Sequence, residues 1–371
     1  MPSHTIEIRH ADSICDSSHS SHNRWHPDIA PALRIASGET VVIQTRDSLD
    51  GQINAGMAGK DMANVTLDRC HPLTGPIYVE GAEPGDQLAV HIRRIVTPDC
   101  GFTAIFPGFG ALSDLYPEPF LLHWDLSRDG ATSVQLPGVT IPAAPFMGVM
   151  GLAPSLTRLR QVSARERAAA ARGGHVFLPN AAGAVPADPA IANEAWRTVA
   201  AHEVGGNMDI RQLGAGSTLY LPVDVRGALF STGDAHFAQG DGESCGTAVE
   251  TSATVTCEFE VIKQSAHGPH GQFPSFECPR TETSGIGRRG YFATSGLPVT
   301  ADGHVEPFNA TLAARNALQA MIEKVVKEFG YSAQQAYCIV SVAGDLRMSA
   351  VVNTPHTLVS VLMPRSIFGD R

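Results

Sequence analysis

The sequence predicts a mainly β protein of the α+β class, with a jelly-roll- or sandwich-like core of hairpins and a few helices, two of them near the C-terminus. Three observations favour this class. The 371 residues include 36 Gly and 25 Pro, which indicates many turns and therefore many short strands. Hydrophobic residues make up 43% and charged residues 17%, a balance that can fill a sizeable core. Helical periodicity stands out only near the C-terminus.

Two segments of the N-terminal part predict hairpins. Residues 32–45 (ALRIASGETVVIQT) hold two apolar runs around a Ser-Gly-Glu turn, a pattern typical of a hairpin. Residues 75–90 (GPIYVEGAEPGDQLAV) repeat the order of strand, Gly-acid turn and strand, as expected for successive hairpins of a sandwich or barrel. Residues 102–125 are rich in Phe, Pro and Gly, and they form either a loop that covers a pocket or a segment that packs in the core.

The chain is longer than one average domain. We therefore expect an N-terminal β-rich lobe over residues 1–155, a connecting segment over 156–200, and a second β-rich lobe with C-terminal helices over 201–371, packed as one unit. The connecting segment is rich in Ala, Arg and Pro, which predicts a surface loop followed by a short helix from about Ala190.

The second half contains further strand patterns and two helices. Residues 218–223 and 248–263 predict strands, and the second of them alternates as a half-buried strand does. Apolar residues with helical spacing predict a helix that ends before Gly330; they are Leu318, Met321, Ile322, Val325 and Phe329. Ser332 is expected to cap a second helix that continues to about Cys338, and both helices are expected on the outside of the sheets.

The charge argues against some partners, and the cysteine pattern argues against some kinds of covalent or metal site. The net charge of −10 disfavours nucleic acid and anionic membranes because their phosphates are repelled at long range. The seven cysteines are scattered without a Cys-x-x-Cys pair, which indicates neither a disulfide framework nor a thiolate zinc site. Residues 1–25 lack an apolar segment typical of a secretory leader. We therefore expect a cytoplasmic protein that acts on a small molecule.

The densest polar segment, GDAHFAQGDGESCG, carries Asp234, His236, Asp241 and Glu243. On paired strands, residues two apart project from the same face, and residues 237–240 suffice for a hairpin turn between them. Such a hairpin brings four charged or ligating groups together. Imidazole and carboxylate ligands suit Zn²⁺ or another divalent cation that keeps an open position for water. A Gly/Asp-rich surface turn with solvated acids is the alternative.

Two further clusters are weaker. In GGNMD at residues 205–209, the adjacent glycines permit positive φ and close approach of the backbone to a ligand, and Asn207 and Asp209 alternate onto one face. In the second cluster, Asp50 and Gln52 follow a predicted strand end, where polar side chains often form sites. Ordinary Asx and Asp-Gly turns explain both patterns equally well.

The chain resembles the acetamidase/formamidase family of amide hydrolases. Four motifs in one order carry the resemblance: TRDSLDGQ at 45–52, HPLTGPIYVEGA at 71–82, GGNMD at 205–209, and GDAHFAQGDGE at 233–243 with the following Cys245. Shorter similarities extend it over residues 25–364. The resemblance implies hydrolysis of a small carboxamide, such as formamide or acetamide, to a carboxylate and ammonia. It also implies a β-rich fold, a homo-oligomer and a divalent metal, with Zn²⁺ preferred and Ca²⁺ or Mg²⁺ as alternatives.

The resemblance also implies roles for individual residues. The candidate metal ligands are Asp50, Asp209 and His236, and Glu243 is the candidate general base or fourth ligand. The further catalytic candidates are Asp241 and Cys245, and the candidate substrate-binding residues are Gln52, Asn54, His71 and Asn207.

Two mechanisms and two other functions stay open. Water activated by the metal is the favoured nucleophile, with Glu243 moving the proton. The thiol of Cys245 is the rival, although acidic neighbours disfavour its thiolate. Because the Ala/Arg-rich stretch at 160–190 can border the pocket, a larger amide or a lactam is an alternative substrate. A protein that binds metal or a small ligand without catalysis is the alternative to an enzyme.

Overall fold

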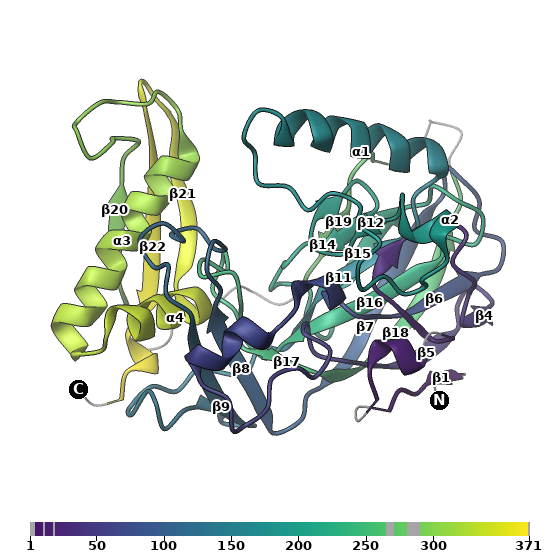
Figure 1. Cartoon of the computed structure of the whole chain (residues 1–371), viewed down its shortest axis with the longest axis horizontal. Coiled ribbons are helices and arrows are strands. Elements are labelled where there is room, and N and C mark those ends of the chain that lie inside the picture. Colours follow the sequence, from purple (N-terminus) through teal and green to yellow (C-terminus); the bar gives the residue numbers. More distant parts are fainter. Residues whose placement is uncertain (1–3, 10–11, 18, 265–270, 280–289, 370–371) are drawn as a thin grey trace.

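In the computed structural model of this chain, the described residues are 4–9, 12–17, 19–264, 271–279 and 290–369. Two large β-sheets pack against each other in one part of the molecule, and a smaller sheet with two helices forms the C-terminal part beside them (Figure 1). The mainly β fold class and the two helices near the C-terminus are therefore confirmed.

One layer is a six-stranded sheet with the strand order β1-β5-β18-β7-β15-β19. Its strands are β1 (His4–Ile6), β5 (Thr40–Thr45), β7 (Gln87–Val96), β15 (Thr218–Pro222), β18 (Ala253–Ile262) and β19 (Ser275–Glu277). Buried and half-buried residues alternate along most of β18, as expected for a strand with one face in the core. The predicted strands within 218–223 and 248–263 are confirmed.

The other layer is an eleven-stranded sheet. Its main path is β10-β9-β8-β17-β16-β11-β14-β13, and β6 pairs with β16 and carries β2 and β4. The strands are β2 (Ser21–His22), β4 (Leu33–Ile35), β6 (Leu73–Val79), β8 (Cys100–Ile105), β9 (Phe120–Ser127), β10 (Gly130–Thr132), β11 (Phe146–Leu152), β13 (Ala201–His202), β14 (Gly205–Asn207), β16 (Phe230–His236) and β17 (Glu250–Thr251). A separate pair joins β3 (Arg24–Trp25) and β12 (Trp196–Arg197).

The two large sheets share one apolar core. The rings of Phe230 in β16 and Phe259 in β18 meet edge to face with their centroids 5.0 Å apart, and both belong to the same buried cluster. Each sheet combines strands from residues 1–155 with strands from residues 201–371. The two halves of the chain therefore interleave in one sandwich.

The two predicted hairpins are corners that connect the sheets. Within residues 32–45, β4 pairs in parallel with β6 of the eleven-stranded sheet, whereas β5 pairs with β1 and β18 of the other sheet. Within residues 75–90, β6 and β7 are divided between the sheets in the same way. The hairpin prediction is wrong for both segments, because a Gly-acid turn serves a change of sheet as well as a reversal within one sheet.

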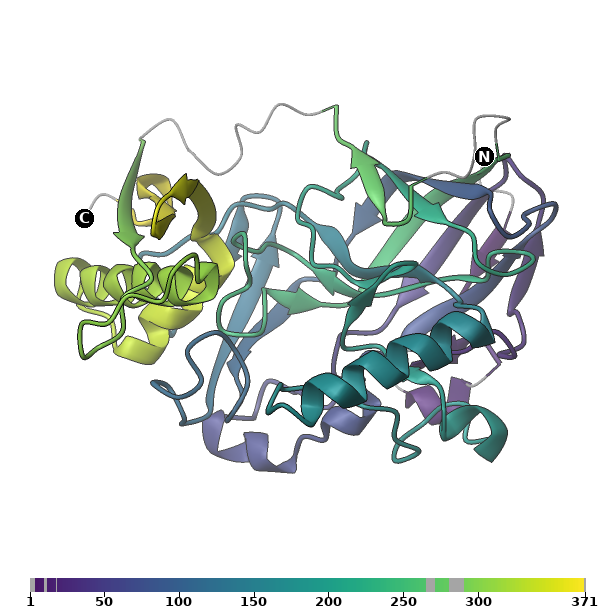
Figure 2. The same ribbon diagram turned by 90° about the horizontal axis from the view of Figure 1, so that it is seen from above.

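The connecting segment contains a helix that the sequence analysis did not predict. α1 (Leu156–Ala170) begins after Ser155, whose side chain accepts the N–H of Arg158. The helix was missed because it buries only a narrow apolar stripe, although its many Ala and Arg residues favour helix. Figure 2 shows α1 lying along one side of the sandwich. The short α2 (Pro189–Ala192) coincides with the helix expected near residue 190.

The C-terminal part is a three-stranded sheet covered by two helices. Its strand order is β20-β22-β21, and its elements are β20 (Tyr291–Gly296), α3 (Ala310–Phe329), α4 (Ala333–Ala343), β21 (Asp345–Asn353) and β22 (His356–Pro364). α3 ends at Gly330 with φ of 75°, and Ser332 caps α4, both as predicted. The expected outside position is wrong for α4: residues 336–343 are buried, and the helix contacts α3, β8 and β22.

An ion pair joins the C-terminal sheet to the sandwich. Arg211 follows β14 and donates a hydrogen bond to the carboxylate of Asp345 at the start of β21. Removing one partner of a buried pair leaves the other charge uncompensated. We expect Asp345→Ala to lower the free energy of unfolding by about 2–4 kcal/mol, measured by urea denaturation. Asp302→Ala is the control, because that side chain is 71% exposed; equal effects of the two substitutions would contradict this prediction.

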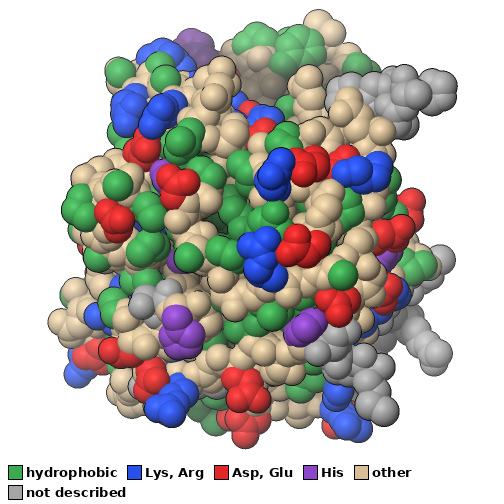
Figure 3. Space-filling view, turned by 90° about the vertical axis from the view of Figure 1, so that its right-hand side faces the viewer, with side chains coloured by type: hydrophobic (Ala, Val, Ile, Leu, Met, Phe, Trp, Pro, Cys, Tyr) green, Lys and Arg blue, Asp and Glu red, His purple; other side chains and the backbone are tan. Residues whose placement is uncertain are grey.

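On the face seen in Figure 3, basic and acidic side chains are interspersed among the described residues. All seven cysteines are free thiols. Within the described part of the chain, none of the helices is both long enough and apolar enough to span a membrane.

Candidate active site

β16 lies within the eleven-stranded sheet and carries Asp234 and His236. The pairing of β16 with β11 is interrupted at one position: Gly148 of β11 and Asp234 of β16 are left unpaired, although the residues on both sides of them pair. Asp234 has φ of 56°, a left-handed conformation that is uncommon for residues with a Cβ and that concentrates at functional sites. The interruption lets both side chains reach one place: Nε2 of His236 lies 3.4 Å from Oδ1 of Asp234.

Glu250 is a site residue that the sequence analysis missed. β17 pairs with β16 so that Glu250 lies opposite His236, and its Oε1 is 3.3 Å from Nε2 of His236. The turn predicted at 237–240 is wrong, because the connection extends over residues 237–249 and brings Glu250 rather than Asp241 beside His236. One signal in the sequence could have identified Glu250, which directly follows two apolar residues. Because buried acids are rare, an acidic residue in an apolar segment indicates a special role.

Two loops bring Asp209 and Glu243 to the same place. The backbone N–H of Asp209 donates to the carbonyl oxygen of Gly148 over 3.2 Å. Glu243 lies between β16 and β17, and its Oε1 is 3.9 Å from Nε2 of His236. Asp209 and Glu243 have φ of 49° and 41°. Left-handed backbone at several neighbouring acidic residues is typical of a functional site.

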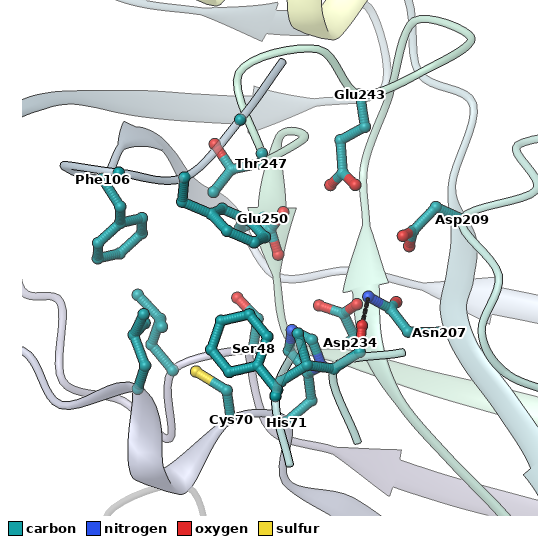
Figure 4. A pocket seen from close by; sticks show the side chains of 18 of the residues that line it. Ser48, Cys70, His71, Phe106, Asn207, Asp209, Asp234, Glu243, Thr247 and Glu250 are labelled. Carbon is teal, nitrogen blue, oxygen red and sulfur yellow. Dashed lines mark hydrogen bonds between the residues drawn. The ribbon is translucent and has the colours of Figure 1, made fainter. Parts of the chain in front are cut away.

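These side chains form one group, which we call the acidic cluster: Asp209, Asp234, His236, Glu243 and Glu250. One ligand atom each from Asp209, Asp234 and His236 lies within 4.8 Å of the others, and the same holds for His236, Glu243 and Glu250. Figure 4 shows the four carboxylates around a shared space. Three residues chosen from the sequence, Asp209, His236 and Glu243, thus lie together.

The acidic cluster fits a divalent cation. Oδ1 of Asp209, Oδ1 of Asp234, Oε2 of Glu250 and Nε2 of His236 are buried without a hydrogen-bond partner. Buried charges without partners are costly, and a cation satisfies several of them at once. Carboxylate oxygens with one imidazole nitrogen are donors that Zn²⁺ and other divalent metals accept.

Gln239 orients the ring of His236. Its Nε2 donates to the carbonyl oxygen of Asp209 over 2.9 Å, which directs its Oε1 to Nδ1 of His236, also at 2.9 Å. Because the amide oxygen can only accept, Nδ1 carries a hydrogen and Nε2 is the nitrogen directed into the acidic cluster. Gln239 is a second residue that the sequence analysis missed.

Gly148 leaves room for the acidic cluster. A Cβ at this position would lie 2.7 Å from both Oδ1 of Asp209 and Oδ2 of Asp234, and 2.9 Å from Cε1 of His236. Such contacts are shorter than real Cβ atoms make, so the cluster requires glycine in β11.

Burial and mutual charge shift the pKa values of the acidic cluster. Burial raises the pKa of Asp209 to about 7, and burial together with Asp209 raises the pKa of Glu243 well above its usual value. Burial opposes the charging of His236, but Glu250 and Asp234 outweigh it and raise its pKa. Burial also opposes ionisation of Asp234, yet His71 and His236 outweigh it and lower its pKa. Such opposed shifts are typical of functional sites.

The acidic cluster opens into a cavity of about 590 Å³. Other lining residues include Ser48, Leu49, Leu67, Cys70, His71, Phe106, Phe109, His175, Phe177, Val199, Asn207 and Thr247. Both interpretations of the segment 102–125 hold in part: residues between 106 and 113 line this cavity, whereas Phe102, Leu112 and Tyr116 pack in the core. His175, Phe177 and Val199 come from the connecting segment, which therefore borders the cavity as expected.

Two predicted substrate-binding residues face this cavity, His71 and Asn207. Nδ1 of His71 lies 3.1 Å from the carbonyl oxygen of Thr198, so Nε2 is the ring nitrogen left for a ligand. Nδ2 of Asn207 donates to the carbonyl oxygen of Val199 over 3.1 Å, whereas its Oδ1 is buried without a partner (Figure 4).

The structure does not bring Asp50 into the acidic cluster. Its carboxylate accepts the N–H of Ile14 at 2.9 Å and lies 3.5 Å from Arg46 and 3.6 Å from Arg69. Two arginines and a backbone donor already compensate this charge, so the assignment of Asp50 as a ligand is corrected. Asp234 and Glu250 lie in the acidic cluster instead.

Gln52 and Asn54 also lie away from the cavity of the acidic cluster. Nε2 of Gln52 donates to the carbonyl oxygens of Leu49 and Thr66, and its Oε1 accepts the N–H of Thr66. Asn54 is exposed and accepts the N–H of Gly56. Both residues line a separate, open surface pocket. Their polar groups form hydrogen bonds that stabilise the loop after β5.

The further catalytic candidates, Asp241 and Cys245, do not line the cavity either. Asp241 lies 3.9 Å from Arg211. Cys245 is fully buried, and its Sγ contacts the carbonyl oxygen and Oγ1 of Thr247. Burial alone would raise the pKa of Cys245, but hydrogen bonds with Cys338, Ser341 and Thr247 lower it to about 7. The acidic neighbours considered from the sequence are therefore not what sets this pKa.

The fold and the cavity define a class: a β-sandwich protein with an enclosed site of four carboxylates and one imidazole. The chain belongs to the acetamidase/formamidase family, whose sequence profile matches residues 7–370. It is 36% identical to the acetamidase of Mycolicibacterium smegmatis, over 97% of this chain and 94% of that protein. It is 33% identical to the formamidase of Methylophilus methylotrophus, over 94% of this chain and 89% of that protein.

A solved structure supports the fold. The γ-lactamase from Delftia acidovorans superposes with a TM-score of 0.91 and 32% sequence identity, and the match covers 99% of this chain and 93% of that one. The family resemblance inferred from the motifs is confirmed.

Proposed function

We propose that this protein hydrolyses the C–N bond of a carboxamide and releases a carboxylate and ammonia. Membership of the acetamidase/formamidase family supports this activity, and so do the names of the acetamidase and formamidase relatives. The observation that carries the proposal is the acidic cluster: its carboxylates line a cavity large enough for an amide, and several of its oxygens and Nε2 of His236 are buried without a hydrogen-bond partner.

Asp209, Asp234 and His236, with Glu250 beside them, are the residues that would hold a divalent cation, with Zn²⁺ the first choice. When bound, the cation supplies a Lewis acid that polarises the amide carbonyl and makes water more acidic. Gln239 keeps the metal-facing nitrogen of His236 in place. Gly148 keeps the space open.

The chain's own residues perform the proton transfer and positioning. Glu243 faces the cavity from a loop and acts as the general base. It accepts a proton from the attacking water while the water oxygen bonds to the amide carbon. The same carboxyl group then returns the proton to the nitrogen as the C–N bond breaks, because an amide nitrogen leaves only when protonated. The free Oδ1 of Asn207 accepts a hydrogen bond from the amide N–H₂.

Chelation tests this function directly. Removing divalent metal with EDTA and dialysis is expected to lower the rate of ammonia release from acetamide by at least about 100-fold, because several kcal/mol of transition-state stabilisation are lost. Adding back Zn²⁺, Ca²⁺ or Mg²⁺ separately, with elemental analysis, identifies the metal. Full activity in protein shown to be metal-free would overturn the metal proposal. A lower melting temperature without any amide turnover would favour a non-catalytic binding protein.

A lactam is the second candidate substrate. The superposition on the γ-lactamase favours it, and ring opening uses the same bond cleavage without releasing ammonia. Assaying 2-pyrrolidinone by the appearance of the amino acid separates this activity from linear amide hydrolysis. A homo-oligomer and a cytoplasmic location stay predictions from the sequence, and gel filtration with light scattering tests the first.

A further inference from the structure

The cavity has two chemically different sides. Figure 4 shows Asp209 and Glu243 on one side and Phe106 on the other. Leu49 and Leu67 are also part of the lining, together with Phe109 and Phe177. An amide held at the acidic cluster therefore has a wall of apolar and aromatic side chains within the same cavity.

The size of the cavity exceeds the needs of the smallest amides. Acetamide has four non-hydrogen atoms, which occupy about 120 Å³ if each takes roughly the 30 Å³ of a water molecule. The cavity measures about 590 Å³, which lies in the range of pockets that enclose much larger ligands. A larger acyl group can therefore fill the apolar side.

The position of Phe177 in this wall is fixed by its contacts. The guanidinium carbon of Arg197 lies 5.0 Å from the centroid of its ring, and the ring of Phe109 meets it edge to face at 6.2 Å. Arg197 is itself buried, and its guanidinium group donates a hydrogen bond to the carbonyl oxygen of Leu67. Phe177 therefore contacts both a buried cation and a second aromatic ring of the cavity lining.

Buried polar residues also anchor the segment that follows Phe177. Arg24 donates to the carbonyl oxygens of Asn180 and Ala182, both at 2.8 Å. The side chain of Asn23 accepts the N–H of Val185 at 2.8 Å. Because Arg24 and Asn23 are fully buried, the chain directly after Phe177 is anchored to the body of the protein.

We propose that the preferred substrate is a neutral primary carboxamide whose acyl group carries an aryl or similarly bulky apolar group, and that Phe177 determines this preference. The proposal rests on the amidase function proposed above. The amide group lies at the acidic cluster and the aryl group lies against Phe106, Phe109 and Phe177. The acidic cluster disfavours a further negative charge in the same cavity, so the acyl group is uncharged. For phenylacetamide, water adds to the carbonyl carbon, the C–N bond breaks, and phenylacetate and ammonium leave.

The test compares phenylacetamide with acetamide in the metal-loaded enzyme. The wild-type kcat/KM is expected to be at least about 10-fold higher for phenylacetamide, because even one buried methylene changes this ratio by about 10-fold or more. Phe177→Ala is expected to lower the kcat/KM ratio of phenylacetamide to acetamide by about 10-fold. Phe273→Ala is the matched control, since this phenylalanine is 65% exposed and does not line the cavity, and it should leave the ratio unchanged.

A binding measurement keeps the inference testable apart from turnover. Calorimetry of Glu243→Gln with phenylacetamide is expected to show binding that Phe177→Ala, added to this variant, weakens by about 10-fold. Turnover of acetamide with no preference for phenylacetamide overturns the substrate inference but leaves the amidase function standing. Binding of phenylacetamide without hydrolysis of any amide overturns the amidase function alone. Absence of both binding and turnover overturns both.

Discussion

Gly148→Ala is expected to remove divalent metal from the protein and to abolish amide hydrolysis. The added methyl group would lie 2.7 Å from carboxylate oxygens of both Asp209 and Asp234, so these side chains must move apart. Loss of a supporting contact around a metal lowers affinity by about 10- to 100-fold, and direct displacement of two ligands should reach at least about 100-fold. Metal content per chain, measured by elemental analysis after dialysis, and ammonia release from acetamide are the readouts.

A destabilising glycine substitution elsewhere separates this effect from misfolding. At Gly296 in β20, an added Cβ would lie 2.2 Å from the carbonyl oxygen of Ala313 in α3. Gly296→Ala should therefore lower the melting temperature while the folded protein keeps its metal. If Gly148→Ala retained both metal and activity, the acidic cluster would not be the metal site.

Glu243→Gln is expected to lower kcat by about 10²–10⁴-fold, the usual contribution of a general acid–base group. The amide is close in size to the carboxylate but cannot accept the proton of water. Because Asp209, Asp234 and His236 remain, the variant should still bind metal. Steady-state kinetics with acetamide and elemental analysis measure the two properties.

Asp241→Asn provides the matched control. Asp241 lies two residues away in the same loop, but its carboxylate is directed to Arg211 rather than to the cavity. This variant should keep kcat within about 3-fold of the wild type, as expected for a group that does not take part in proton transfer. The opposite result, with Asp241→Asn inactive and Glu243→Gln active, would contradict the assignment of Glu243 as the general base. It would favour the hairpin predicted from the sequence, in which Asp241 also reaches the site.

The sequence could predict which kinds of group make the site but not the complete set. Asp209, His236 and Glu243 were found because they stand in polar, Gly-rich segments at strand ends. Glu250 was missed because its position depends on the pairing of β17 with β16 across a loop of 13 residues, from 237 to 249. Asp50 was wrongly included because the sequence does not show that Arg46 of the same motif and the distant Arg69 both turn toward its carboxylate.

The sequence by itself determined the mainly β class, the caps of α3 and α4, and the chemical types in the active site. These properties depend on composition, on local periodicity and on residues a few positions apart. Only the tertiary structure decided which consecutive strands belong to different sheets, which carboxylates lie beside His236, and which aromatic side chains line the cavity. Those outcomes depend on strand register and on contacts between distant segments, and the physical reason is that a local pattern is compatible with several pairing partners.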